Sequence, residues 1–181
     1  MAFSDKFREV MKFVLKWEGG YVNNPADPGG ETKYGISKRS HPNEDIKNLT
    51  VERALQIYND SYWRAIDGES RPFPEALAVM DFAVHSGTSR SLGFWARSEG
   101  DVDAFVAARM DFLASISTFN SFGRGWVRRV EDLRRVIKEH ESTPDVELVQ
   151  FFIGENSYNF RPVRASVGRT NGGGIKHMYR L

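Results

Sequence analysis

The sequence contains no cysteine. Disulfide bonds, thiolate metal ligands and a cysteine nucleophile are therefore excluded. No apolar run approaches the roughly 18 residues of a membrane span, and charges are mixed into the first residues, so we expect neither a transmembrane helix nor an export signal. Apolar residues still make up 40% of the 181 residues and aromatic residues 13%, which is enough to bury a core and argues against a disordered or fibrous chain.

The sequence also lacks a large net charge, since 25 basic residues stand against 24 acidic ones. The charged residues are, however, unevenly distributed along the chain. Residues 156 to 181 contain five basic side chains and no acidic one, which leaves 20 basic against 24 acidic, a net −4, in residues 1 to 155. A nucleic-acid binder needs a basic body, so we expect no nucleic-acid partner. The pattern predicts a single domain over residues 1 to 155 and a separate basic tail over residues 156 to 181.

The spacing of apolar residues predicts an α+β fold that is mainly α-helical. Ser4 can cap a first helix that Gly19 ends, and its buried stripe consists of Phe7, Val10, Met11, Val14 and Leu15. Residues 21 to 36 are rich in turn formers and predict a small β-hairpin lobe after this helix. Helices are predicted from there on, with caps at Thr50, Ser89 and Asp101, a helix from residue 125 to 140 and a short one from residue 144 to 153. The glycine triplet at 172 to 174 argues against regular structure in the tail.

Glu18 is the most informative residue of the first helix. It lies eleven positions after Phe7, which at about 100° per residue places it on the apolar stripe. Apolar surroundings and the partial negative charge of the helix C-terminus would both raise its proton affinity, as a general acid near neutral pH requires. The alternative is that the helix frays in its last turn and that Glu18 simply reaches solvent.

Two further residues could complete a site with Glu18. Asp27 lies in a Pro-Ala-Asp-Pro loop nine residues later, and Thr32 follows on a predicted strand. A carboxyl acid on a helix end that faces a second carboxylate and a hydroxyl is a plausible arrangement for hydrolysing a glycosidic bond, because one group protonates the leaving oxygen while the others orient water. Alternatively, Asp27 caps a turn and Thr32 is an ordinary strand residue.

Residues 18 to 37 carry a specific motif, EGGYVNNPADPGGETKYGIS. It resembles the signature of glycoside hydrolase family 108, muramidases that are often phage endolysins. Later segments extend the resemblance over about residues 8 to 137: Tyr62-Trp63, MDFAVHSG at 80 to 87 and GWVRRV at 125 to 130. These later segments resemble the part of such proteins that is described as a peptidoglycan-binding region.

The resemblance implies a lysozyme-like fold, with a catalytic part over about residues 8 to 95 and a helical peptidoglycan-binding part over about 96 to 155. It implies an N-acetylmuramidase that cleaves the β-1,4 bond between N-acetylmuramic acid and N-acetylglucosamine, without a metal or another cofactor. Glu18 is then the catalytic acid, with Asp27 and Thr32 as the other catalytic residues. Thr32 stands one residue earlier than in related phage enzymes, and His85 stands where Asn is expected, which adds a group that ordinarily titrates near pH 6.5.

Several side chains are candidates for binding the substrate. Aromatic rings can stack on sugar faces, although any one of them could instead belong to the core. Asp81 and His85 lie four apart and could pair across a cleft or form a structural pair, and no third ligand stands at the spacing that zinc requires. The predicted substrate-binding residues are Tyr21, Tyr34, Tyr62, Trp63 and His85.

Two other activities stay open beside the muramidase: a catalytically inactive peptidoglycan-binding module and a lytic transglycosylase. We expect a monomer whose partners are peptidoglycan glycan strands. The basic tail could bind an anionic wall or membrane surface, or it could fold back and complete the core. We expect synthesis in the host bacterial cytoplasm and action on the cell wall, in the periplasm, after release by a holin or a secretion route.

Overall fold

The computed structural model describes residues 2 to 23, 30 to 142, 150 to 153 and 156 to 159. The chain divides into two compact units, Met1–Thr143 and Pro144–Leu181. The boundary that the charge pattern predicts, after residue 155, lies inside the second unit. Within that unit, β3 (Gln150–Ile153) and β4 (Asn156–Asn159) form an antiparallel hairpin in which Gln150 pairs with Asn159.

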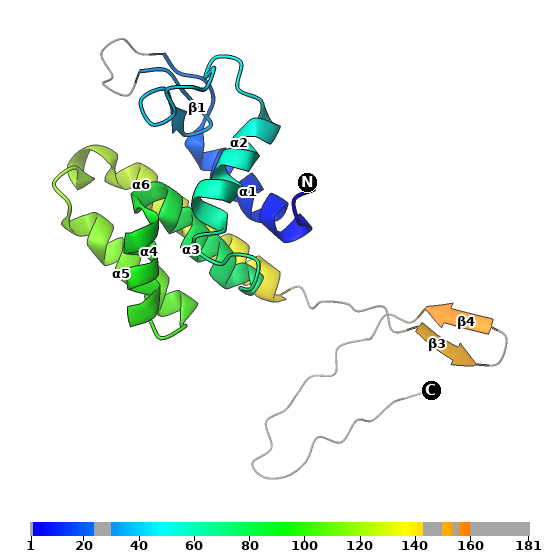
Figure 1. Cartoon of the computed structure of the whole chain (residues 1–181). Helices are drawn as coiled ribbons and strands as arrows, with labels where there is room; N and C mark the ends of the chain where they lie inside the picture. The colour runs from blue at the N-terminus through cyan, green and yellow to red at the C-terminus, as the bar shows by residue number, and fades with distance from the viewer. Residues whose placement is uncertain (1, 24–29, 143–149, 154–155, 160–181) are drawn as a thin grey trace. The chain divides into compact units, whose positions relative to one another are not determined.

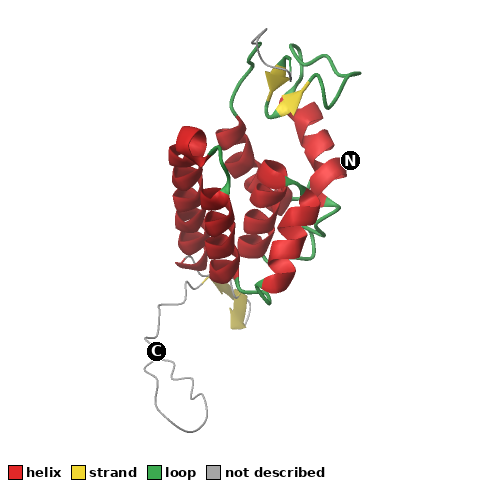
Figure 2. Cartoon of the chain, turned by 90° about the vertical axis from the view of Figure 1, so that its left-hand side faces the viewer, coloured by secondary structure: helices red, strands yellow, loops and turns green. Residues whose placement is uncertain are grey.

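The first unit is mainly helical (Figures 1 and 2). Its helices are α1 (Asp5–Glu18), α2 (Val51–Tyr58), the π-helical segment η1 (Asn59–Trp63), α3 (Phe73–Ser86), α4 (Thr88–Arg97), α5 (Val102–Ser115) and α6 (Phe119–Ser142). The strands β1 (Thr32–Lys33) and β2 (Ile36–Ser37) form a small antiparallel hairpin at one end of the helices (Figure 2). The predicted mainly α-helical α+β fold, with a hairpin lobe after the first helix, is confirmed and is consistent with a lysozyme-like fold.

Helix α3 lies at the centre of the core. It packs against α1, α4, α5 and α6, and every residue from Ala76 to Ala83 is buried. A helix that is apolar on nearly all sides is stable only when other helices cover it, which explains its central position. Asp81 is the one charged residue in this buried stretch and is fully buried.

Local capping signals placed several helix starts correctly. The hydroxyls of Ser4 and Thr50 and the carboxylate of Asp101 each accept a hydrogen bond from the backbone N–H three residues later. The predicted cap at Ser89 is wrong, because α4 begins at Thr88 with Gly87 as its N-cap residue.

Two predicted elements differ from the structure. Helix α6 begins at Phe119 instead of residue 125, because Gly123 and Gly125 lie inside the helix, and the ring of Phe119 packs over Gly123. The helix predicted over residues 144 to 153 is wrong where the structure describes it, since Gln150–Ile153 is a strand whose backbone pairs with β4. No helix in the described part of the chain is long and apolar enough to cross a membrane.

Candidate active site

Glu18 is the last residue of α1, and two other elements meet at its carboxyl group. Its side chain is 18% exposed, and Oε1 accepts a hydrogen bond of 2.8 Å from Nη2 of Arg129 on α6. Its other oxygen, Oε2, faces Gly35 in the hairpin turn. The helix therefore does not fray at this point, and Glu18 is held at the junction of α1, the hairpin and α6 while part of it stays open to solvent.

The hairpin turn needs glycine at position 35 for two reasons. Tyr34 and Gly35 have φ of 53° and 75°, and a two-residue hairpin turn of type I′ requires positive values at both positions. A Cβ atom on Gly35 would also lie 2.7 Å from Oε2 of Glu18 and 2.5 Å from Oη of Tyr58. Tyr58 fixes the turn by donating a 2.7 Å hydrogen bond to the carbonyl oxygen of Tyr34. The backbone of the turn thus lies directly against the Glu18 carboxyl.

Behind Glu18 lies a buried network of charged side chains. Arg129 bridges two carboxylates, because its Nη2 also donates to Oδ1 of Asp81 at 2.7 Å while its Nε donates to the same oxygen at 2.9 Å. Arg109 on α5 donates to the other oxygen of Asp81 at 2.6 Å. Asp81 and Arg109 are both fully buried. The order Glu18–Arg129–Asp81–Arg109 alternates negative and positive charges across four helices.

The two arginines determine the charge state of Asp81. Burial alone would raise the pKa of this carboxyl, but Arg109 and Arg129 outweigh burial and hold the pKa below its ordinary value. The carboxylate therefore stays charged and orients Arg129 toward Glu18. The prediction of apolar surroundings for Glu18 is wrong, since a guanidinium from α6, 111 residues later in the chain, contacts it.

Of the two residues predicted to act with Glu18, the structure describes Thr32 alone. Asp27 lies outside the described residues. Thr32 lies on β1, in the hairpin whose turn contacts Glu18, and its backbone exchanges two 2.8 Å hydrogen bonds with Val22. Its side chain is half-buried and forms no hydrogen bond with another described residue. The roles of Glu18, Asp27 and Thr32 in catalysis remain predictions.

The four predicted aromatic residues have different surroundings. Tyr62 lies near Glu18: burial, and then the negative charge of Glu18, raise the pKa of its hydroxyl. Tyr34 contributes the carbonyl oxygen that Tyr58 binds, and Tyr21 is 40% exposed and donates a hydrogen bond to Glu31. Trp63 cannot stack on a sugar, because it is only 3% exposed and its ring lies 5.2 Å from that of Phe7 in the core.

His85 is half-buried at the end of α3, with its ring 5.6 Å from that of Trp126. It does not pair with Asp81, whose hydrogen bonds go to the two arginines. Burial, and then the positive charges of Arg109 and Arg129, lower the pKa of His85 to about 4, although Asp81 acts in the other direction. The expected titration near pH 6.5 is therefore wrong, and His85 is a neutral donor and acceptor at neutral pH.

The site contains residues that the motif analysis did not select. Arg109 and Arg129 complete the network, Gly35 lets the turn approach Glu18, and Tyr58 holds that turn. A signal for Arg109 exists in the sequence, because it is a charged residue within the apolar run of α5. Within the described ranges, no group of three or more histidine or acidic side chains could hold a metal ion.

Comparisons with known proteins agree with this arrangement. Residues 11–87 match the family model of glycosyl hydrolase 108, a segment that runs from the middle of α1 to the end of α3 and contains Glu18, the hairpin and Asp81. The solved structure of SagA from Brucella abortus is similar with a TM-score of 0.65 and 28% identity, over 76% of this chain and 97% of that chain. A comparison with curated proteins finds no match.

The family match ends before α4, whereas Arg109 and Arg129 come from α5 and α6. The similarity to SagA covers a larger share of the chain than the family model does and therefore includes part of the later helices. Through residues 11–87, the chain is similar to glycosyl hydrolase family 108, and this similarity supports a glycoside hydrolase.

Proposed function

We propose that this protein hydrolyses the β-1,4 bond between N-acetylmuramic acid and N-acetylglucosamine in peptidoglycan, with Glu18 as the proton donor. The observation that carries the proposal is the position of the Glu18 carboxyl. Arg129 and Gly35 hold it in one orientation, yet 18% of the side chain is open to solvent. A general acid needs both properties, since it must reach the glycosidic oxygen in a defined geometry.

The proposed reaction needs a proton on the leaving oxygen and a water molecule at the sugar carbon. Glu18 donates the proton to the glycosidic oxygen as the bond to the sugar carbon breaks. Asp27 takes a proton from the attacking water as the new bond to the sugar carbon forms, while Thr32 helps to orient this water. Tyr62 lies near Glu18, Tyr34 directly precedes Gly35, and His85 lies near Arg129. In this proposal they offer ring faces and hydrogen-bonding groups to the sugars.

The lytic transglycosylase is the main alternative, because it uses the same substrate and a single acid. Digestion of purified peptidoglycan, with mass spectrometry of the products, separates the two reactions. The proposal predicts muramic acid at the reducing ends. Anhydro-muramic ends would indicate a transglycosylase, reducing-end glucosamine would indicate a glucosaminidase, and no release of fragments would indicate a binding module.

The biological setting is part of the same proposal. We infer that the enzyme acts on the cell wall as an endolysin, after a holin or a secretion route has released it from the cytoplasm. Its partner is the glycan strand. The basic residues at 156 to 181 favour attraction to anionic wall or membrane surfaces, which would raise the local concentration of enzyme.

A further inference from the structure

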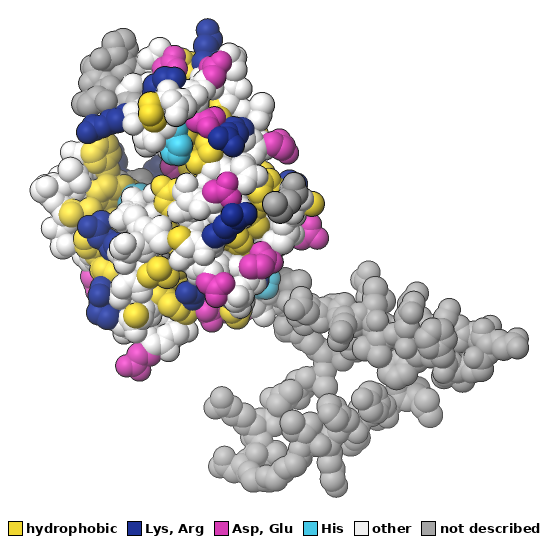
Figure 3. All heavy atoms as spheres, in the orientation of Figure 1, with side chains coloured by type: hydrophobic (Ala, Val, Ile, Leu, Met, Phe, Trp, Pro, Cys, Tyr) yellow, Lys and Arg dark blue, Asp and Glu magenta, His cyan; other side chains and the backbone are white. Residues whose placement is uncertain are grey.

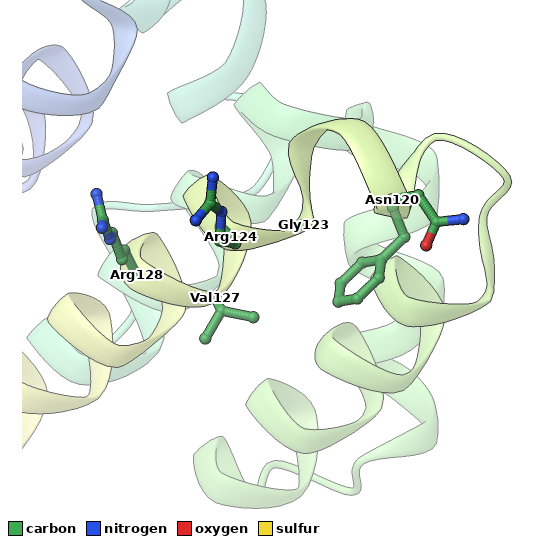
Figure 4. A pocket seen from close by; sticks show the side chains of 6 residues that line it. Asn120, Gly123, Arg124, Val127 and Arg128 are labelled. Atoms are coloured by element: carbon green, nitrogen blue, oxygen red, sulfur yellow. The ribbon is translucent and has the colours of Figure 1, made fainter.

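A cavity of about 480 Å³ lies along the first half of α6 (Figure 4). Its lining residues are Phe119, Asn120, Gly123, Arg124, Val127 and Arg128. Phe119 and Val127 give it apolar walls, while the two arginines give it positive charge. None of these six residues belongs to the charge network that holds Glu18.

Arg124 and Arg128 differ from other arginines of the same helix. Arg129 pairs with Asp81 and Glu18, and Arg135 pairs with Asp132 and Glu139. Arg124 and Arg128 are exposed and form no hydrogen bond or ion pair with any residue in the described part of the chain.

The spacing of these two arginines is unfavourable for the stability of the helix. They stand four residues apart on one helix, where like charges repel each other. Figure 4 shows both side chains extending to the same side of α6. Two guanidinium groups on the same side of a helix, without a carboxylate partner among the described residues, are suited to bind a ligand that carries carboxylates, because each planar group can donate two parallel hydrogen bonds.

The cavity lies on the helix that also carries the contact to Glu18. Arg128 directly precedes Arg129, which binds Glu18. At about 1.5 Å per residue, Arg124 lies roughly 7.5 Å along the helix axis from Arg129. Figure 3 shows a hollow between the lobe around β1 and the helices below it, with basic side chains at its rim. A glycan strand that reaches Glu18 would therefore bring its substituents close to this cavity.

We propose that the cavity binds the peptide stem of peptidoglycan, with Arg124 and Arg128 on the carboxylates of the stem. The inference rests on the proposed function and adds a specificity determinant to it. Stem peptides extend from the muramic acid residue, next to the bond that is cleaved, and carry free carboxylates. Their short aliphatic side chains fit the walls that Phe119 and Val127 provide. The site therefore favours glycan that still carries its peptides.

The test compares two double variants on two substrates. The cavity variant, Arg124→Gln with Arg128→Gln, removes the charges of the cavity. The control variant, Arg134→Gln with Lys138→Gln, removes two exposed charges that also stand four residues apart, in the second half of α6 and outside the cavity. The substrates are intact peptidoglycan and the same material after an amidase has removed the stems. For the cavity variant we expect KM on intact peptidoglycan to rise about tenfold or more, with kcat nearly unchanged and KM on stem-free glycan unchanged. For the control variant we expect no change on either substrate.

A second measurement does not depend on catalysis. The free stem tripeptide of alanine, glutamate and diaminopimelate is titrated into the full-length protein and into both variants, and binding is followed by NMR. We expect binding that the cavity variant loses and the control variant keeps. Equal KM changes on both substrates, equal effects of the two variants, or absence of tripeptide binding would overturn the inference. Absence of hydrolysis by the unmodified protein would overturn the proposed function instead, and tripeptide binding would still decide this inference.

Discussion

Glu18 and Asp81 are both carboxylates on apolar helix faces, but their surroundings differ. Asp81 is fully buried between two arginines, whereas Glu18 has one oxygen on Arg129 and a side chain that is partly open to solvent. A buried carboxylate with every oxygen occupied can only hold other groups in place. The partly open one is the group that can exchange a proton with a substrate.

Replacement of Asp81 by Asn should destabilise the protein strongly. The change leaves the buried Arg109 without its negative partner and leaves Arg129 with Glu18 alone, and removal of one member of a buried pair costs about 3–5 kcal/mol. Urea unfolding, followed by circular dichroism, measures the free energy of unfolding. Asp60→Asn is the control, because the ion pair of Asp60 with Arg64 is exposed and should contribute little to the free energy of unfolding. Similar unfolding midpoints for both variants would contradict the structural role of Asp81.

His85 should make stability depend on pH. Its pKa in the folded protein is about 4, below the ordinary value near 6.5, so the unfolded chain binds the proton first. The contribution of His85 is fully present above pH 6.5 and is lost as the pH falls from 6.5 toward 4. Unfolding at a series of pH values should show that the free energy of unfolding falls by on the order of 1 kcal/mol by pH 5. This figure is reduced for solvent screening, because His85 is partly exposed. A His85→Asn variant should lack this loss, and an identical slope in the variant would contradict the assignment.

Single residues also show how far the sequence alone can lead. Glu18 was predicted from its place on a helical stripe, a local property. The partners that hold it were not, because Arg129 and Asp81 lie 111 and 63 positions further along the chain. The apolar character of the stripe therefore led to a wrong description of the surroundings of Glu18. The same lack of packing information left Trp63 among the sugar-binding candidates, although it is buried against Phe7.

At the level of elements, some helix starts follow from local capping residues, whereas other helices depend on tertiary contacts. The helices capped by Ser4, Thr50 and Asp101 begin where their side-chain hydrogen bonds are expected. Helix α6 continues through two glycines, because its stability comes from the face that packs on α3 and α5 and not from its first turns. The strand β3 was predicted as helix because four residues are too few to distinguish the two periodicities, and its pairing with β4 is not visible in the local sequence.

The hairpin turn should be intolerant of a methyl group at position 35. Gly35→Ala adds a Cβ atom that meets Tyr58 and Glu18, and it also strains a residue with φ of 75°. Gly100→Ala is a matched control, because φ is 82° there but nothing lies within 4 Å of the added atom. Each variant should lose about 1–3 kcal/mol of stability from backbone strain. Only Gly35→Ala should also lower kcat on purified peptidoglycan, and equal kcat values for the two variants would show that the turn does not position Glu18.

For the whole molecule, the division of the chain into two units guides the choice of a truncation. Deletion of residues 156 to 181 would remove β4 and leave β3 without its partner strand, whereas a chain that ends at Thr143 contains the complete first unit. The charge pattern predicts a boundary after residue 155, which differs from the division after Thr143, because strand pairing does not follow charge.

The chain that ends at Thr143 should keep its melting temperature and its turnover of soluble glycan fragments. It should bind whole walls more weakly than the full chain, since it lacks the basic residues at 156 to 181, and the difference should be largest at low salt, where screening is weakest. Thermal unfolding and a sedimentation assay with purified walls measure the two effects. A large fall in melting temperature would show that the second unit stabilises the first.

The proposal that Glu18 donates the proton is tested most directly by the turnover of Glu18→Gln on purified peptidoglycan. The amide keeps the size of the side chain and an oxygen for the hydrogen bond from Arg129, so the melting temperature should be retained. It cannot deliver a proton, so kcat should fall by at least about 100-fold. A folded Glu18→Gln variant that retains more than about a tenth of the activity would contradict the assignment of Glu18 as the catalytic acid.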